Sequence, residues 1–470
     1  MRWSIRFLGI ISITVLARLL SKEDFGLVAI ASAIIALPAA LIDFGVEGAL
    51  LRDNKATPAT YNTAWTIRAL QMSIVGVLLF LSAPYVAALY GDTRVVLVVQ
   101  VLAVMVFLQG IENIWVVSFR KQLQFSRDFT YNALSRLVAT FCTIGLAFWL
   151  RSYWALVLGQ LIHSGVRIVV GTAMAKALPK PTLSEWHRIW DYSKWSLFSG
   201  FAFYLSEQSD RLILGRATDL SGVGTYSIGK EVALFPIAEL SMPANRALTP
   251  GLAQLQDEPK RFSAALAKAI GAVSTLALPM GIGLALTAKD AIPLLLGSGW
   301  AGAIPVVELL GLGSAFAAGR RVLGNGFRVN GQIKQVAYLS WLNAAGLIGF
   351  GILCTSQMGI VGMAVAVLLT ELVSTCACAY YSQRFLQGFT LRLVLHHVSR
   401  AVFATVAMII AVKAVDPLLQ PGVYRLFGDA IVGAITYSVA LLASWYVAKM
   451  PDGIEQQVLT FVKQRLGKAG

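Results

Sequence analysis

The chain alternates between long runs of apolar residues and short polar segments. Each run is close to the length, about 20 residues, that an α-helix needs to cross the apolar core of a bilayer. Only helices and closed barrels satisfy every backbone hydrogen bond in lipid, and runs of this length favour helices. We predict fourteen spans, at residues 3–20, 25–43, 64–89, 93–118, 129–150, 153–176, 191–215, 221–247, 262–286, 302–324, 334–355, 359–383, 394–415 and 425–449. The first run is interpreted as a span, not as a signal peptide, because more spans follow it.

Composition agrees with a membrane protein of many spans. Apolar residues make up 57% of the chain and charged residues 13%, and the mean hydropathy is +0.69. A soluble protein is nearer half apolar and a quarter charged. The net charge of +15 would suggest nucleic acid in a soluble chain, but here basic residues are expected to hold loops in the cytoplasm. Cys142, Cys354, Cys376 and Cys378 lie in apolar runs, and all four are interpreted as small buried residues.

Connections rich in lysine and arginine alternate along the chain with connections that have few of these residues. With the N-terminus in the cytoplasm, the inside connections hold Arg120, Lys121, Arg127, Lys176, Lys180, Arg188, Lys260, Arg261, Arg328, Lys334, Arg384 and Arg392. The outside turns hold fewer basic residues, among them Lys22, Arg94, Lys289 and Arg425. This asymmetry predicts an even number of spans with both termini in the cytoplasm.

The chain repeats a pattern from its first two spans at a constant offset of 198 residues. The matched positions are Leu16-Ala17-Arg18 with Leu214-Gly215-Arg216, Gly26 with Gly224, Ile30 with Ile228, Pro38 with Pro236, and Ala40 with Ala238. Later, Phe119-Arg120 corresponds to Phe327-Arg328 with ten additional residues between. Such a repeat is typical of a duplicated transporter unit; chance similarity between two apolar helices is the alternative.

The repeat predicts the organisation of the chain. We expect an N-terminal six-helix bundle at residues 1–180, a second at 181–388, and two further helices with a cytoplasmic tail at 389–470. Because each bundle has an even number of spans, the two have the same topology. They would be related by a pseudo-two-fold axis along the membrane normal, with a cavity between them.

Several motifs resemble a known family. Residues 17–29 have the sequence ARLLSKEDFGLVA, and Asp43-Phe44-Gly45 follows in the second span. Asp210 precedes Gly215-Arg216, and Gly224-Thr225-Tyr226 comes next. Together these segments are similar to the polysaccharide transport (Wzx-type, oligosaccharide flippase) branch of the multidrug/oligosaccharidyl-lipid/polysaccharide (MOP) flippase superfamily. The resemblance covers nearly the whole chain, and fourteen spans is the usual number in that superfamily.

The resemblance implies a function. A member of this branch would move undecaprenyl-diphosphate-linked oligosaccharide repeat units across the bacterial inner membrane by alternating access, for O-antigen, capsule or exopolysaccharide biosynthesis. The expected partners are this lipid-linked substrate, membrane lipids, a coupling ion (proton or sodium), and the polymerase and export machinery. Two features depart from the family pattern. Members usually carry more residues before the first span, and Glu47 and Arg211 are more charged than the pattern expects.

Charged residues within the predicted spans are the candidates for a substrate cavity. An ionisable side chain at the bilayer centre costs about 2.5–3.5 kcal/mol and usually faces a wet interior. The candidates are Glu112, Arg136, Glu207, Asp210, Arg211, Lys230, Glu231, Glu239, Arg246 and Glu308. Arginine and lysine suit a diphosphate, whereas carboxylates suit sugar hydroxyls or a coupling proton. A packed ion pair or a charge at a helix end is the structural alternative for each of them.

Other functions remain open at this point. The same charges fit a drug/cation antiporter or a peptidoglycan lipid-precursor flippase of the same superfamily. A membrane enzyme usually needs a large outside loop with catalytic residues, and we find neither such a loop nor a catalytic motif. We therefore predict no enzymatic activity, no cofactor, no metal and no nucleic-acid partner. A scaffolding role is less favoured, because it does not explain charges within spans.

The topology gives a direct prediction. Reporter fusions after His187 and after Asp219 are expected to report cytoplasm and periplasm respectively, because basic connections alternate as described. Paired alkaline phosphatase and green fluorescent protein fusions measure this. The reverse pattern would contradict the orientation.

Overall fold

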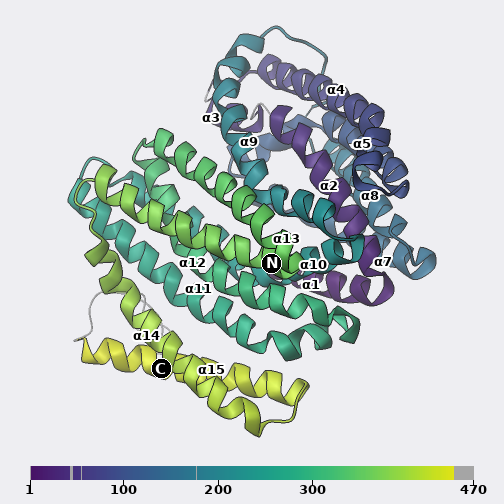
Figure 1. The fold of residues 1–470 in the computed structure, drawn as a ribbon. Coiled ribbons are helices and arrows are strands. Elements are labelled where there is room, and N and C mark those ends of the chain that lie inside the picture. Colours follow the sequence, from purple (N-terminus) through teal and green to yellow (C-terminus); the bar gives the residue numbers. More distant parts are fainter. Residues whose placement is uncertain (1, 43–45, 54, 176, 449–470) are drawn as a thin grey trace, which may run out of the picture. The chain divides into compact units, whose positions relative to one another are not determined.

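The computed structural model is helical throughout the residues that it describes, which are 2–42, 46–53, 55–175 and 177–448 (Figure 1). At some of these, including 188–200 and 239–247, only the backbone is described. The helices are α1 (Arg2–Leu19), α2 (Lys22–Ile42), α3 (Val46–Arg52), α4 (Pro58–Tyr90), α5 (Arg94–Ile111), α6 (Val117–Lys121), α7 (Phe125–Leu150), α8 (Trp154–Met174), α9 (Trp186–Ala217), α10 (Leu220–Ala253), α11 (Pro259–Leu296), α12 (Ile304–Val329), α13 (Ile333–Phe385), α14 (Leu391–Val415) and α15 (Val423–Val447). Three 3₁₀ helices complete the set: η1 (Ile114–Val116), η2 (Ser298–Ala303) and η3 (Asp416–Leu418).

Length and composition identify membrane-spanning helices. Among the described residues, nine helical segments are long and apolar enough to cross a bilayer: α4, α5, α7, α8, α11, α12 with η2, α13, α14 with η3, and α15. The prediction of an all-helical membrane protein of many spans is therefore confirmed.

The chain forms two compact units, Met1–Ser227 and Ile228–Gly470. Each has its own apolar core. In the first unit Leu27, Val75, Leu102 and Val157 are buried together on α2, α4, α5 and α8. In the second unit the core joins α10, α11, α12 and α13 with the start of α14, and it includes Ile237, Leu266, Val322 and Cys378. The division into bundles at residues 180 and 388 stays a prediction.

One predicted span is shorter in the structure. Residues 93–118 were expected to form a single helix, but α5 ends at Ile111. The backbone leaves the helical region at Glu112, and the Asn113 side chain accepts a hydrogen bond from the N–H of Trp115 at 3.0 Å, which starts η1. Asparagine favours this capping role because its short side chain competes with the helical hydrogen bond. Glu112 therefore lies at a helix end and not in the middle of a span.

Helix α13 is a hairpin of two arms. At Gly359 φ is +57° and ψ is −132°, a conformation that residues with a side chain rarely adopt. A Cβ atom at Gly362 would lie 2.0 Å from the carbonyl oxygen of Cys354, so the arms approach closely just beyond the turn. Farther along, Asn343 Nδ2 donates to Ser374 Oγ at 3.0 Å. The arms correspond to the predicted spans 334–355 and 359–383.

The cysteine interpretation is partly wrong. Cys378 is buried, but Cys376 is exposed, and Cys142 and Cys354 are half-buried. Residues two apart on a helix point in different directions, about 200° around its axis, so one of the pair faces the core while the other faces outward. All four thiols are free.

The connection between α8 and α9 is fastened to the first turns of α4. Pro58 and the N-cap Thr57 start α4 with a capping box, and the next turns present polar side chains to the connection. The hydrogen bonds run from Asn113 Nδ2 to the Ala177 carbonyl (3.0 Å), from Lys180 N to Asn62 Oδ1 (3.1 Å), from Thr182 N to Thr66 Oγ1 (2.9 Å), from Glu185 N to Thr63 Oγ1 (3.3 Å), and from Thr57 and Thr60 to the Glu185 carboxylate. A carboxylate at this helix N-terminus is also favoured by the helix dipole. The backbone donors of an extended segment thus gain partners on a helix surface.

Two glycines of the repeat touch each other where α2 crosses α10. A Cβ at Gly26 would lie 1.8 Å from the carbonyl oxygen of Leu220, and a Cβ at Gly224 would lie 1.9 Å from that of Lys22. The contact is reciprocal, because Lys22 is separated from Leu220 by the same 198 residues as Gly26 from Gly224. Reciprocal contacts between equivalent residues are what a two-fold relation between the two segments produces.

This crossing predicts a strong effect of small substitutions. Gly26→Ala and Gly224→Ala are each expected to lower stability by about 3 kcal/mol or more, beyond ordinary overpacking, because the clash is with backbone. Thermal unfolding of the purified protein and its level in membranes measure this. Gly145→Ala is the matched control on α7, where an added Cβ meets no atom within 4 Å. Wild-type stability of both test variants would show that the crossing is not tightly packed.

Candidate functional site

A buried ion-pair network surrounds Glu112 in the first unit. Glu112 is only 2% exposed. Both of its carboxylate oxygens lie 3.1 Å from Arg167 Nε on α8, and Oε2 lies 3.4 Å from Arg68 Nη2 on α4. Two guanidinium groups on one carboxylate compensate for its loss of water. The structure therefore joins three helices through this candidate residue.

The network continues outward from this pair of arginines. Arg68 Nη1 lies 3.7 Å from Glu47 Oε1, and Arg120 Nη2 donates to Glu47 Oε2 at 3.1 Å. Arg120 Nε also lies 3.4 Å from Asp128, and the Arg167 guanidinium is 5.0 Å from the centre of the Tyr131 ring. The network balances three arginines with three carboxylates. Within this unit Glu112 is therefore a member of a packed ion pair, which was the alternative to a role in a substrate cavity.

Asp210 and Arg211 have different surroundings although they are neighbours on α9. Asp210 and Tyr226 are both completely buried, and the Tyr226 hydroxyl donates to Asp210 Oδ2 at 2.9 Å. Arg211 Nη1 donates to Gln208 Oε1 at 3.0 Å, while its Nε is buried with no hydrogen-bond partner among the described residues. Glu207, one turn earlier, is exposed. Arg211 is thus the candidate with unused hydrogen-bonding capacity.

The other candidates are spread over both units. Arg136 on α7 is exposed, and its guanidinium lies against Gly9 of α1. In the second unit Lys230 is half-buried and Glu231 is exposed. Glu308 on α12 is half-buried and forms no hydrogen bond or ion pair with the described residues. The side chains of Glu239 and Arg246 lie outside the described residues, so the shared face predicted for them on α10 stays a prediction.

Arg320 and Glu371 also lie within predicted spans, but they are not among the candidates chosen from the sequence. The structure pairs them in the second unit. Arg320 Nε lies 3.0 Å from Glu371 Oε2, and Arg320 Nη2 lies 2.9 and 2.7 Å from Oε1 and Oε2. This fork geometry joins α12 to the second arm of α13. The pair could not be found from spacing, because 51 residues separate the partners in sequence.

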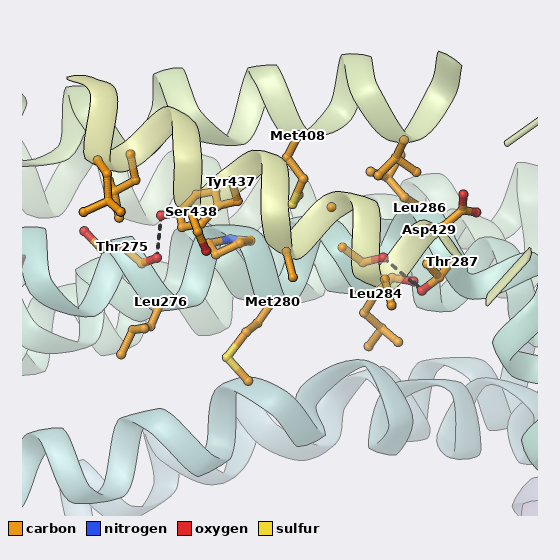
Figure 2. A pocket seen from close by; sticks show the side chains of 18 residues that line it. Thr275, Leu276, Met280, Leu284, Leu286, Thr287, Met408, Asp429, Tyr437 and Ser438 are labelled. Atoms are coloured by element: carbon orange, nitrogen blue, oxygen red, sulfur yellow. Dashed lines mark hydrogen bonds between the residues drawn. The ribbon is translucent and has the colours of Figure 1, made fainter. Parts of the chain in front are cut away.

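Sequence reasoning also missed an apolar groove of about 730 Å³ in the second unit. Helices α11, α14 and α15 pack together and form its walls. Its lining comes from Thr275, Leu276, Pro279, Met280, Gly283, Leu284, Leu286, Thr287, Met408, Val412, Asp429, Ala430, Gly433, Ala434, Tyr437, Ser438, Leu441 and Leu442. Figure 2 shows Thr275 and Leu276 toward one end, and Thr287 and Asp429 toward the other. The volume lies within the range of about 300–1,000 Å³ typical of ligand sites.

Comparison with known proteins identifies the family. Residues 15–305 match the family described as polysaccharide biosynthesis protein, and this match spans more than half of the chain. The chain belongs to this family. The resemblance to Wzx-type flippases of the MOP superfamily is thereby confirmed.

Two relatives are similar over most of their length. The chain is 22% identical over 377 residues to the lipopolysaccharide biosynthesis protein WzxC of Escherichia coli K12, covering 78% of this chain and 76% of that protein. It is 25% identical over 309 residues to the succinoglycan biosynthesis transport protein ExoT of Rhizobium meliloti, covering 65% of this chain and 62% of that protein.

Solved structures share the fold at low sequence identity. The lipid II flippase MurJ, in an inward closed conformation, has a TM-score of 0.79 at 11% identity and covers 95% of this chain and 98% of its own. An inward-facing MATE multidrug transporter of the MOP superfamily has a TM-score of 0.64 at 14% identity and covers 81% of this chain and 94% of its own. The fold is therefore that of MOP superfamily transporters.

The network around Glu112 predicts a loss of stability when its centre is neutralised. Glu112→Gln is expected to cost about 3–5 kcal/mol, because two partly buried guanidinium groups lose their carboxylate. Thermal unfolding followed by tryptophan fluorescence measures it. Asp128→Asn, at the exposed end of the same network, is expected to cost about 1 kcal/mol or less. Equal effects of the two variants would contradict the central place of Glu112.

Proposed function

We propose that the chain is a flippase for undecaprenyl-diphosphate-linked oligosaccharide repeat units in the bacterial inner membrane, serving O-antigen, capsule or exopolysaccharide assembly. The family and the shared fold with a lipid II flippase support transport of a lipid-linked sugar. The observation that carries the lipid part is the apolar groove, because a polyprenyl chain needs an apolar surface that reaches the bilayer. Both termini are proposed to lie in the cytoplasm.

We further propose fourteen spans. The nine segments identified by composition count α13 once, and its two arms add one span. Helices α1, α2, α9 and α10 supply the others, since each is at least 18 residues long. The charged residues of α2 are confined to its first turn, whereas α9 carries them along its length, as expected for a helix that faces a polar interior instead of lipid.

Alternating access is the mechanism we propose, with two halves that exchange their openings. The reciprocal contact of Gly26 with Gly224 supports a duplicated unit, which is the usual basis of such motion. The candidate residues Arg211, Lys230 and Arg246 would meet the diphosphate, because its charges need fixed positive partners to leave water. Arg136, Glu207, Glu231, Glu239 and Glu308 complete the proposed polar lining, facing sugar hydroxyls or balancing charge. The buried Glu112 and Asp210 would instead hold together the helices that carry this lining.

The groove separates this function from the main alternative. A drug/cation antiporter of the same superfamily has no need of a site for a long alkyl chain, whereas a lipid-linked substrate carries its chain across the whole transport cycle. Because the surrounding lipid is as apolar as the groove, the groove would hold the polyprenyl chain by shape and close packing and not by a large hydrophobic gain.

Filling the groove tests this proposal. Gly283→Phe places a ring in the groove, at a position where an added Cβ meets no atom within 4 Å. The ring would occupy space that the polyprenyl chain uses, so the chain would lose its place beside α11, α14 and α15. Surface polysaccharide in a flippase-null strain, at equal protein level, is expected to fall accordingly.

The matched control is Gly349→Phe on α13, which also meets no atom at Cβ and does not line the groove. This variant is expected to restore surface polysaccharide fully. Full restoration by Gly283→Phe as well would remove the groove from the transport path.

A further inference from the structure

Three aspartates and one arginine gather where α11 ends and where α14 turns into α15. Arg425 on α15 holds Asp290 of α11 with two bonds, Nε to Oδ2 at 2.6 Å and Nη2 to Oδ1 at 2.9 Å. The Gly422 N–H also donates to Asp290 Oδ1 at 2.8 Å. Asp290 thus has its negative charge compensated by a bidentate arginine and a backbone donor.

The two remaining carboxyl groups share little of that positive charge. Asp416 in η3 lies 3.4 Å from Arg425 Nε, and its side chain is 47% exposed. Asp429, one turn after Arg425, is only 2% exposed, and its Oδ1 is buried with no hydrogen-bond partner among the described residues. The charged groups acting on Asp429 are Asp416, Arg425 and Asp290, whereas Lys289 on α11 and Lys413 on α14 are exposed.

An ionised carboxylate in this position would be costly. A buried charge without a partner costs several kcal/mol, and one arginine cannot neutralise three carboxylates. Asp416 and Asp429 both lie near Arg425, Asp416 at 3.4 Å from its Nε and Asp429 one turn farther along α15. Two neighbouring carboxyl groups can bond to each other only if one of them carries a proton, because an ionised carboxylate only accepts. Closely spaced carboxylates share one proton for this reason.

We propose that Asp416 and Asp429 form a carboxyl–carboxylate pair that binds one proton at the end of the apolar groove. A proton is favoured over a metal ion, because the described residues contain no group of three ligands placed to hold one. The adjacent Arg425 would also repel a second cation. Because Asp429 lines the groove, the bound proton removes one of the two negative charges that the pair would otherwise place at that end of the groove (Figure 2).

Infrared spectroscopy of the purified protein in lipid nanodiscs tests the pair. An ordinary aspartate has a pKa of about 3.9 and is ionised at about pH 7. The wild-type protein is expected to show a protonated carboxyl band at that pH, and the band should shift when aspartate is labelled with ¹³C at its carboxyl. Asp429→Asn and Asp416→Asn are each expected to remove it. Asp257→Asn, at an exposed position between α10 and α11, is expected to keep it.

Each contrary outcome overturns the proposal. Absence of the band in the wild-type protein, or its survival in Asp429→Asn, would mean that the pair holds no proton. Loss of the band when choline chloride is replaced by sodium chloride would assign the site to sodium. Asp416→Asn keeps the test usable if Asp429→Asn does not fold, because Asp416 is half exposed. The readout needs no transport, so it does not depend on the proposed function.

Discussion

The backbones of α2 and α10 approach each other at Gly26 and Gly224 more closely than any side chain would allow. The start of each of these helices is thereby fixed against the other. The same region holds α9 against α2, because an added Cβ at Gly215 would lie 3.0 Å from the Cδ1 atom of Ile30 and 2.6 Å from the Tyr90 ring. The buried Asp210–Tyr226 bond then joins α9 to α10. Close contacts at these three glycines therefore bring the start of α10 and the end of α9 against α2.

In both units arginines meet buried or half-buried carboxylates of neighbouring helices. Glu112 with Arg68 and Arg167 joins three helices in the first unit. Arg320 with Glu371, and Arg425 with Asp290, do the same in the second. Membrane helices gain little from apolar contact with each other, since lipid is equally apolar. Ion pairs and glycine contacts supply the specificity instead.

An all-helical protein of many spans could be predicted from the sequence, because a run of about 20 apolar residues has few alternatives in lipid. The prediction of helix ends from the sequence failed where a local capping interaction determines the backbone conformation. The Asn113 cap ended α5 early and moved Glu112 from mid-span to a helix end. The partners of buried charges were also out of reach, as Asp290 and Arg425 lie 135 positions apart and Arg425 was assigned only to an outside turn. The equivalence of Gly26 and Gly224 was visible in the sequence, but their direct contact required the fold.

The fastening of residues 177–185 to α4 has a consequence for how the protein is made. The ribosome synthesises α4 well before this connection. The side chains of Thr63 and Thr66 are therefore already present when the connection leaves the ribosome. The connection can then dock before any residue of the second unit has been synthesised, because all of its partners lie upstream. Docking of this connection on α4 would thus be the last step in the assembly of the helices that precede it. A chain interrupted by a ribosomal pause after α9 could therefore already hold this connection against α4.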